Sequence, residues 1–162
     1  MTNKSPNQLD VTEDQVSQPT LVIVSGYFAP LHVGHLNLIE AAAAAGDELM
    51  VIVNNNAQQV LKKGKIILDE NDRLRMVLAL RAVDHALIAI DDDETVSASI
   101  ASIAQRYPDH RIVFGNGGDR ESGAVVPETG VCERYGITMV FDFGGQEKAD
   151  SSTRIIAELE SD

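Results

Sequence analysis

Short apolar runs of strand type alternate along this chain with runs of helical spacing. The run Leu21–Ser25 is rich in β-branched residues, and the helical run Val33–Ala45 follows it. Further strands are expected at Glu48–Val53, His85–Ile90, Arg111–Phe114 and Ile137–Phe141, and further helices at Asp69–Ala82, Thr95–Tyr107 and Ser152–Leu159. Strands and helices that alternate over short connections form βαβ units. The sequence therefore predicts an α/β fold, a single Rossmann-like doubly wound domain with a central parallel five-stranded sheet.

The first 19 residues differ from the rest. They are polar, contain two prolines and show no hydrophobic period, so we expect residues 1–19 to be a flexible arm and residues 20–162 to be the domain. A length of 162 residues suits one domain with a full core. Because aromatic residues make up only 4% of the chain, that core must consist mainly of Ile, Leu, Val and Ala. Such a composition suits a parallel sheet covered by helices.

The net charge limits the classes of partner that the protein is expected to bind. Thirteen Lys and Arg residues against 25 Asp and Glu residues give a net charge of −12, which argues against a nucleic acid or an anionic membrane as partner. The single cysteine, Cys132, supplies no disulfide framework and no thiolate metal site. No apolar run reaches the roughly 18 residues of a membrane span, and no signal peptide is visible. We therefore expect a cytoplasmic protein.

The motif His32-Val33-Gly34-His35 carries the most chemical information. It opens a predicted helix, whose unpaired N–H groups and dipole attract anions. Two imidazoles placed there predict phosphate contact and stabilisation of the charge that develops during phosphoryl transfer. Gly34 would let the backbone approach a ligand closely. The alternatives are two unrelated surface or helix-capping histidines and, with less support, a metal site.

Residues 54–67 are polar, and we interpret them as a loop with a short helical piece. Lys62, Lys63 and Lys65 stand out in so acidic a chain, and a mobile loop could use them to neutralise phosphate oxygens. A solvated surface loop is the alternative. Asp69 suits the N-cap of the next helix, on which Arg73 is either an ion-pair partner or a neighbour of the loop lysines.

Two later segments suit phosphate or nucleotide. Ser151–Arg154 opens the last predicted helix, where Ser and Thr cap N–H groups that could also bind phosphate. The cluster Gly115–Asp119 follows a predicted strand, where a base or ribose could contact the backbone, or it is simply a flexible loop. It matches neither a Walker loop nor G-x-G-x-x-G.

Three motifs in order resemble the cytidylyltransferase-like branch of the nucleotidyltransferase superfamily. Residues 26–35, Gly-Tyr-Phe-Ala-Pro-Leu-His-Val-Gly-His, are similar to the signature G-x-F-D-x-x-H-x-G-H. Residues 69–84 resemble the middle segment that ends in Val-Asp, and residues 151–155 resemble the closing S-[ST]-T-[RK]-I motif. The similarity spans residues 21 to 158. Heptose 1-phosphate adenylyltransferase and glycerol-3-phosphate cytidylyltransferase are the subfamilies that fit best.

The resemblance implies that a phosphorylated small sugar or polyol attacks the α-phosphorus of a nucleoside triphosphate, that AMP or CMP is transferred, and that pyrophosphate leaves. It implies Mg²⁺ with the triphosphate and no covalent intermediate. The implied catalytic residues are His32, His35, Lys65 and Arg154. The implied nucleotide-binding residues are Gly26, Phe28, Gly34, Lys62, Lys63, Gly115, Asp119, Ser152 and Thr153. A homodimer is a hypothesis by analogy with related folds.

Three positions depart from the family pattern. Ala29 replaces the usual Asp, Tyr27 replaces a smaller residue, and Asn116 stands where Lys usually precedes Gly-Gly-Asp. These changes lie where the base and the acceptor would be recognised. A nucleotide-binding regulator with weak or no catalysis therefore remains the alternative function, and a metal-dependent hydrolase is a third.

Overall fold

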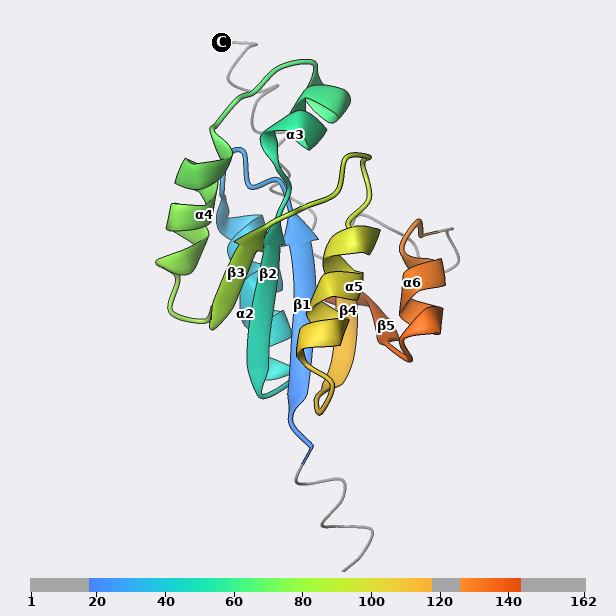
Figure 1. The fold of residues 1–162 in the computed structure, drawn as a ribbon. Helices are drawn as coiled ribbons and strands as arrows, with labels where there is room; N and C mark the ends of the chain where they lie inside the picture. The colour runs from blue at the N-terminus through green and yellow to red at the C-terminus, as the bar shows by residue number, and fades with distance from the viewer. Residues whose placement is uncertain (1–17, 118–125, 144–162) are drawn as a thin grey trace, which may run out of the picture.

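The computed structural model describes residues 18–117 and 126–143, which form a parallel sheet between helices (Figure 1). The strands are β1 (Thr20–Gly26), β2 (Glu48–Val53), β3 (His85–Ile88), β4 (Arg111–Gly117) and β5 (Thr138–Phe143). The helices are α2 (Val33–Ala44), α3 (Asn56–Lys63), α4 (Glu70–Leu78), α5 (Ser97–Arg106) and α6 (Thr129–Arg134). All paired strands are parallel, in the order β3-β2-β1-β4-β5. The prediction of a doubly wound α/β sheet with five strands is confirmed.

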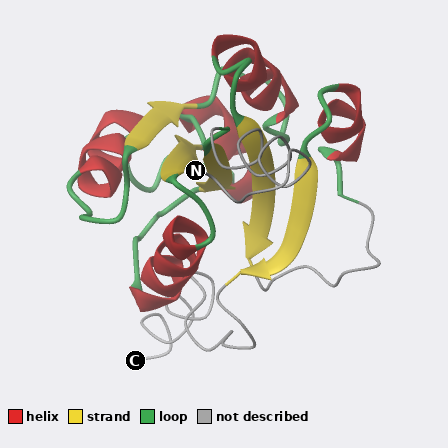
Figure 2. Ribbon diagram, turned by 90° about the horizontal axis from the view of Figure 1, so that it is seen from below, coloured by secondary structure: helices red, strands yellow, loops and turns green. Residues whose placement is uncertain are grey.

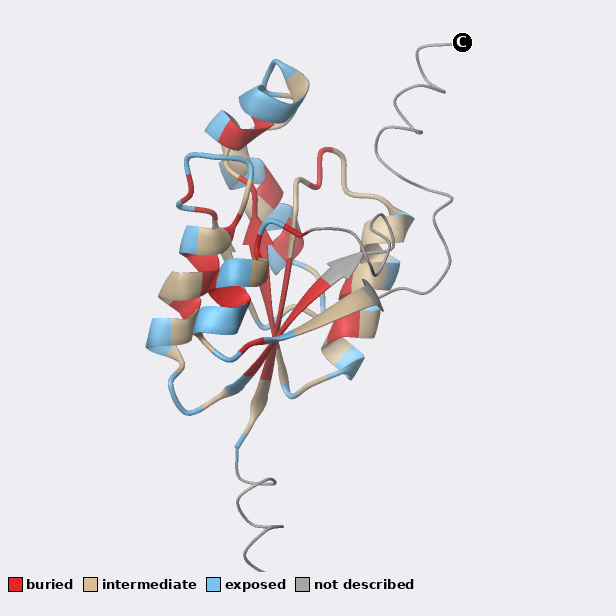
Figure 3. Ribbon diagram, turned by 90° about the vertical axis from the view of Figure 1, so that its right-hand side faces the viewer, coloured by how far each residue is buried: buried red, intermediate tan, exposed pale blue. Residues whose placement is uncertain are grey.

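Alternate residues of each strand enter two separate apolar clusters. Leu21 and Ile23 of β1 face the cluster that includes Ile100 and Ile103 of α5. Val22 and Val24 face the opposite cluster, which includes Ile39 of α2 and Val77 of α4. Helices therefore cover both faces of the sheet, as Figure 2 shows, and the strands are buried between them (Figure 3). Burial on both faces explains why β1 and β2 are continuous apolar runs without polar alternation.

Strand order reverses between β1 and β4, because the chain moves outward through β2 and β3 and then returns to the other side of β1. In open parallel sheets, ligands bind beyond the carboxyl ends of the strands at such a switch point. The turn between β1 and α2 lies at this place, and α3 lies beyond the carboxyl ends of β1 and β2 (Figure 1).

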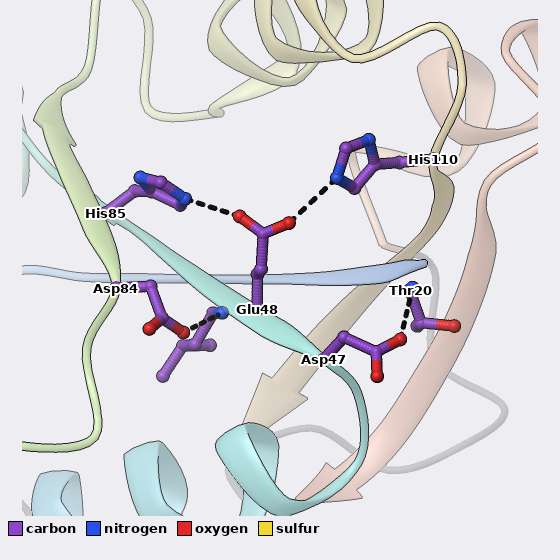
Figure 4. A network of polar contacts seen from close by, with 7 residues as sticks. Thr20, Asp47, Glu48, Asp84, His85 and His110 are labelled. Carbon is purple, nitrogen blue, oxygen red and sulfur yellow. Dashed lines mark hydrogen bonds and ion pairs between the residues drawn. The ribbon is translucent and has the colours of Figure 1, made fainter. Parts of the chain in front are cut away.

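Polar contacts fasten the opposite end of the sheet (Figure 4). Glu48, the first residue of β2, bonds through its two carboxylate oxygens to Nε2 of His85 at 2.7 Å and of His110 at 2.9 Å. Close by, the Thr20 backbone N–H donates to Asp47, and that of Leu49 donates to Asp84. These side chains join the amino ends of the strands, far from the switch point.

Several predicted boundaries are wrong. Residues 54–67 were expected to be a loop with a short helical piece; that piece is α3, which extends over Asn56–Lys63 and places Lys62 and Lys63 in a helix instead of a loop. The glycine cluster was expected after β4, but β4 continues through Gly117. The helix expected at Asp69–Ala82 ends at Leu78, and α6 was not predicted. The arm at residues 1–19 and the helix expected at Ser152–Leu159 fall wholly or almost wholly outside the described residues, so both stay predictions.

Candidate active site

The two histidines of the signature cap α2 together. His32 is the N-cap residue, and its Nδ1 accepts a hydrogen bond from the Gly34 backbone N–H at 3.0 Å. His35 Nδ1 accepts in turn from the His32 backbone N–H at 3.2 Å. This is a capping box built from imidazoles instead of the usual Ser and Glu. Because each Nδ1 is an acceptor, both rings carry their proton on Nε2 in this arrangement.

Packing keeps His35 neutral. Its ring stacks on that of His32 with centroids 3.8 Å apart, and the ring of Phe28 meets it edge-on at 4.9 Å. Burial, followed by electrostatic interactions with His32 and Lys63, lowers the pKa of His35 to about 4. At neutral pH the ring is therefore a neutral N–H donor. The capping alternative and the functional interpretation are compatible, since capping uses Nδ1 alone.

The turn before α2 is shaped by Phe28. This residue adopts a left-handed backbone with φ of +53°, which is uncommon outside glycine. Its ring is buried and lies over Gly26, where a Cβ atom would be only 2.8 Å from the ring carbon Cζ. Gly26 is therefore small in order to make room for Phe28. Ala29 is also buried, so the position where the family pattern has Asp contributes no carboxylate.

Cations reach this turn from α3. The helix begins at the N-cap Asn55 and ends at Gly64, whose φ of +80° provides the left-handed C-cap. Lys62 Nζ lies 4.7 Å from the ring centroid of Tyr27. Lys63 is close enough to act electrostatically on His35, and its own pKa is lowered by burial and by Lys62. The structure thus brings Lys63 near His35 and Lys62 to Tyr27 in the same turn, whereas Lys65 is exposed in the loop between α3 and α4.

Buried amides hold α3 in place. Gln58 Nε2 donates to the carbonyls of Asp93 and Thr95, both at 2.8 Å. Gln59 accepts from the Ile67 backbone N–H at 2.8 Å and donates to the Leu68 carbonyl at 3.0 Å. Both side chains are fully buried. Sequence reasoning missed them, because glutamine in a polar segment normally indicates a solvent-exposed face.

Arg73 is the largest side chain that is fully buried, and it too was underestimated from the sequence. Its guanidinium donates to the carbonyls of Tyr27, Asn54 and Leu68 and to the side-chain oxygen of Asn56. No carboxylate of the described residues lies within ion-pair distance of it, so the expected ion pair is absent from this part of the chain. The hints in the sequence were its place in the segment 69–84 that resembles the family pattern and its spacing of four residues from Val77 on the inner face of α4.

Tyr27 leaves one polar atom unsatisfied. Its hydroxyl is buried and makes no hydrogen bond with any described residue. Burial and the charge of Glu94 raise the pKa of this phenol, while Arg73 acts in the opposite direction. The hydroxyl is therefore protonated at neutral pH and remains available as a donor.

The remaining predicted site residues divide into two groups. Gly115 lies in β4 under the ring of Phe143, which occupies the space of a Cβ atom, so its small size has a packing reason. Asp119, Ser152, Thr153 and Arg154 lie outside the described residues.

Within residues 18–117 and 126–143, no group of three His, Cys, Asp or Glu side chains could hold a metal ion. No helix in these ranges is long and apolar enough to cross a membrane.

Known proteins share both sequence and fold with this chain. An FAD synthase of Methanohalophilus mahii is 43% identical over 74 residues, which are 46% of this chain and 51% of the relative. An FAD synthase of Methanocella paludicola matches equally, at 43% over 74 residues. The chain thus matches about half the length of these curated relatives.

Two solved structures share the fold. The lipopolysaccharide core biosynthesis protein of Thermoplasma volcanium has a TM-score of 0.58 at 23% identity, covering 76% of this chain and 96% of its own. A putative nicotinate-nucleotide adenylyltransferase of Vibrio parahaemolyticus has a TM-score of 0.58 at 19% identity, covering 88% and 87%. The model of the cytidylyltransferase-like family matches residues 23–158, which include the capping histidines, both lysines of α3 and Arg73. The chain therefore belongs to the cytidylyltransferase-like family.

Proposed function

We propose that this protein is a nucleotidyltransferase that moves AMP or CMP from a nucleoside triphosphate to a small phosphorylated acceptor. One observation carries the proposal: the imidazole pair at the N-terminus of α2 lies within electrostatic range of Lys63, while Lys62 lies over the ring of Tyr27 in the β1–α2 turn. Helix N–H groups, N–H donors and ammonium groups are the donors that a polyphosphate requires. The relatives named FAD synthase and adenylyltransferase favour AMP, so ATP is the first donor to test.

In the proposed reaction, an oxygen of the acceptor phosphate attacks the α-phosphorus. A new P–O bond forms there, the bond to the bridging oxygen breaks, and pyrophosphate leaves with the electron pair. The acceptor is already an anion, so no strong base is needed and catalysis consists of positioning and charge stabilisation.

The proposed roles divide among the site residues. His35 and His32 would donate from Nε2 to phosphate oxygens, and Lys62, Lys63 and Lys65 would neutralise charge. Ser152, Thr153 and Arg154 would hold the far phosphates, Asp119 the ribose or base, and Gly26, Phe28, Gly34 and Gly115 would line the cleft.

Mg²⁺ would accompany the triphosphate and offset its charge. The described part of the site offers cations and neutral donors instead of a carboxylate cluster. The residues fit a metal bound mainly through phosphate oxygens, with the ion entering together with its nucleotide. A sugar or polyol phosphate remains our proposed acceptor class, together with nucleotide-like phosphates of the kind suggested by the relatives' names.

A pyrophosphate-release assay tests the proposal. The purified protein is supplied with ATP or CTP, Mg²⁺ and a panel of sugar, polyol and nucleoside phosphates. Release that requires both a triphosphate and one acceptor supports nucleotidyl transfer. Calorimetric binding of nucleotide without release of pyrophosphate with any acceptor would instead support the regulatory alternative, to which the departures at Ala29 and Asn116 point. Release of phosphate or nucleoside monophosphate without an acceptor would indicate a hydrolase.

A further inference from the structure

Arg73 lies beneath the proposed site without being one of its ligand-binding residues. The guanidinium has 0% exposure, so solvent and a bound nucleotide cannot reach it. Burying a cation carries a substantial desolvation cost, and burial accordingly lowers the pKa of Arg73. The carboxylates of Glu70 and Asp69 act on it in the opposite direction, from beyond ion-pair distance. Within the described part of the chain no carboxylate pairs with this buried charge, so its hydrogen bonds must compensate for the lost hydration.

The acceptors of its hydrogen bonds come from the segments that carry the site. Nη1 donates at 3.0 Å to the Tyr27 carbonyl in the turn before α2, and also to the Asn54 carbonyl at the end of β2. Nη2 donates at 3.2 Å to the side chain of Asn56, the first residue of α3. Nε donates at 2.8 Å to the Leu68 carbonyl in the loop after α3.

We infer that Arg73 is a positioning residue that fixes the histidine-bearing turn against the lysine-bearing helix α3. The expected effect on nucleotide binding rests on the proposed function. The role of Arg73 in holding the turn against α3 does not depend on any ligand. The guanidinium of Arg73 donates to four acceptors from three nitrogen atoms, which the single ammonium of Lys cannot reproduce. Loss of these hydrogen bonds lets the turn and α3 separate, and it displaces donors that must lie within hydrogen-bond reach of phosphate oxygens.

The first readout is nucleotide affinity. Calorimetry measures the Kd of ATP, CTP and inorganic tripolyphosphate for the wild type, Arg73→Lys and Arg73→Met at a temperature at which all three are folded. We expect the Kd values to rise about tenfold in both variants, since small displacements of positioning groups cost up to about a hundredfold. The control Arg75→Lys changes an exposed residue of the same helix, and its Kd should stay within about twofold of the wild type.

A second control separates positioning from a general loss of stability. Val77→Ala leaves a cavity on the same helix, at a residue with 0% exposure whose apolar side chain donates no hydrogen bond to the turn or to α3. If Val77→Ala lowers the thermal midpoint as much as Arg73→Lys and weakens nucleotide binding equally, Arg73 is merely structural and the inference is overturned. If only the Arg73 variants weaken binding, the inference holds.

The third readout needs no ligand. In the wild type the His35 ring should not titrate between pH 5.5 and 8 by NMR, because packing against its neighbours lowers its pKa to about 4. In Arg73→Met the loosened turn should move that pKa toward the ordinary value of about 6.5. A wild type that binds no nucleotide would overturn the proposed function, while the His35 titration would still decide the role of Arg73.

If Arg73→Met does not fold, Asn56→Ala takes its place, because it removes one hydrogen-bond acceptor of Arg73 and leaves the guanidinium intact. A rise of the His35 pKa that is smaller than the rise expected for Arg73→Met supports the inference. Unchanged His35 titration together with unchanged nucleotide affinity in the folded variants overturns it.

Discussion

The ring of Phe28 meets the imidazole of His35 edge-on, with centroids 4.9 Å apart and planes at 67°. This contact helps to withdraw His35 from water, and burial is the main cause of its low pKa. The site therefore combines a neutral imidazole donor with separate ammonium charges on α3. Phosphate binding in this protein should depend on the lysines for charge and on the histidines for directed hydrogen bonds.

Replacing His35 separates capping from catalysis. Gln is the ordinary partner in a capping box, so His35→Gln should keep the bond to the His32 backbone N–H and remove the ring Nε2. We expect kcat to fall about 10²- to 10³-fold with a thermal midpoint near that of the wild type. His35→Ala should lose the same activity and, in addition, about 1 kcal/mol of stability. Activity of His35→Gln close to the wild-type rate would mean that the histidine serves as a cap alone.

The low pKa of His35 predicts how stability depends on pH. Between about pH 6.5 and pH 4, the unfolded chain binds a proton at His35 that the folded chain does not. Stability should therefore fall as pH decreases through this window, by up to about 3 kcal/mol. Denaturant unfolding at successive pH values measures the slope, and His35→Gln should show a shallower one. Equal slopes in the two proteins would show that His35 is not held neutral by the fold.

The alternation of runs was enough to predict the sheet, because β1 and β2 are apolar on both faces and their neighbours have helical spacing. The histidines were placed correctly at the start of a helix. The glycine cluster was misplaced because Gly115 is accommodated inside β4 by the ring of Phe143, a contact between distant parts of the chain. A cluster of glycines usually indicates a turn or loop.

The buried polar residues that hold the site's segments in place could not be predicted from the sequence. Gln58, Gln59 and Arg73 are polar residues whose burial depends on carbonyl groups supplied by other segments. No local pattern shows whether such groups will be present. The extent of α3 was underestimated for the same reason, since its inner face is built from amides instead of aliphatic side chains.

Gly26→Ala tests how closely Phe28 is fitted. The new methyl group would lie 2.8 Å from the ring carbon Cζ, so the ring must move. We expect a loss of about 1–3 kcal/mol in the free energy of unfolding, as in other overpacked cores. The displaced ring should also expose His35 and raise its pKa from about 4. Gly130→Ala is the matched control, because a Cβ atom there meets nothing within 4 Å. Thermal melts and NMR titration of both variants measure these effects.

Glu48→Gln tests the contacts at the far end of the sheet, shown in Figure 4. Hydrogen bonds from His85 and His110 lower the pKa of Glu48, so its contribution to stability is present above about pH 4.5 and is lost as pH falls through the lowered value. In Glu48→Gln the free energy of unfolding should change less as the pH is lowered. The affinity for nucleotide should stay within about twofold of the wild type. Because the carboxylate is partly exposed to solvent, the loss at neutral pH should not exceed about 1 kcal/mol. A change in nucleotide binding would contradict the separation of this end from the site.

Lys63→Gln tests whether α3 supplies the charge of the site. Removing this ammonium should weaken the binding of ATP and tripolyphosphate about threefold to tenfold, which corresponds to about 1 kcal/mol for a partly screened charge. The effect should shrink as NaCl concentration rises, because salt screens the attraction. The His35 pKa should rise, since Lys63 is one of the groups that lower it. Arg106→Gln removes the same charge from an exposed position on α5 and controls for net charge. If both variants lose affinity equally, the cation of α3 acts through the overall charge of the protein and not at the bound phosphates.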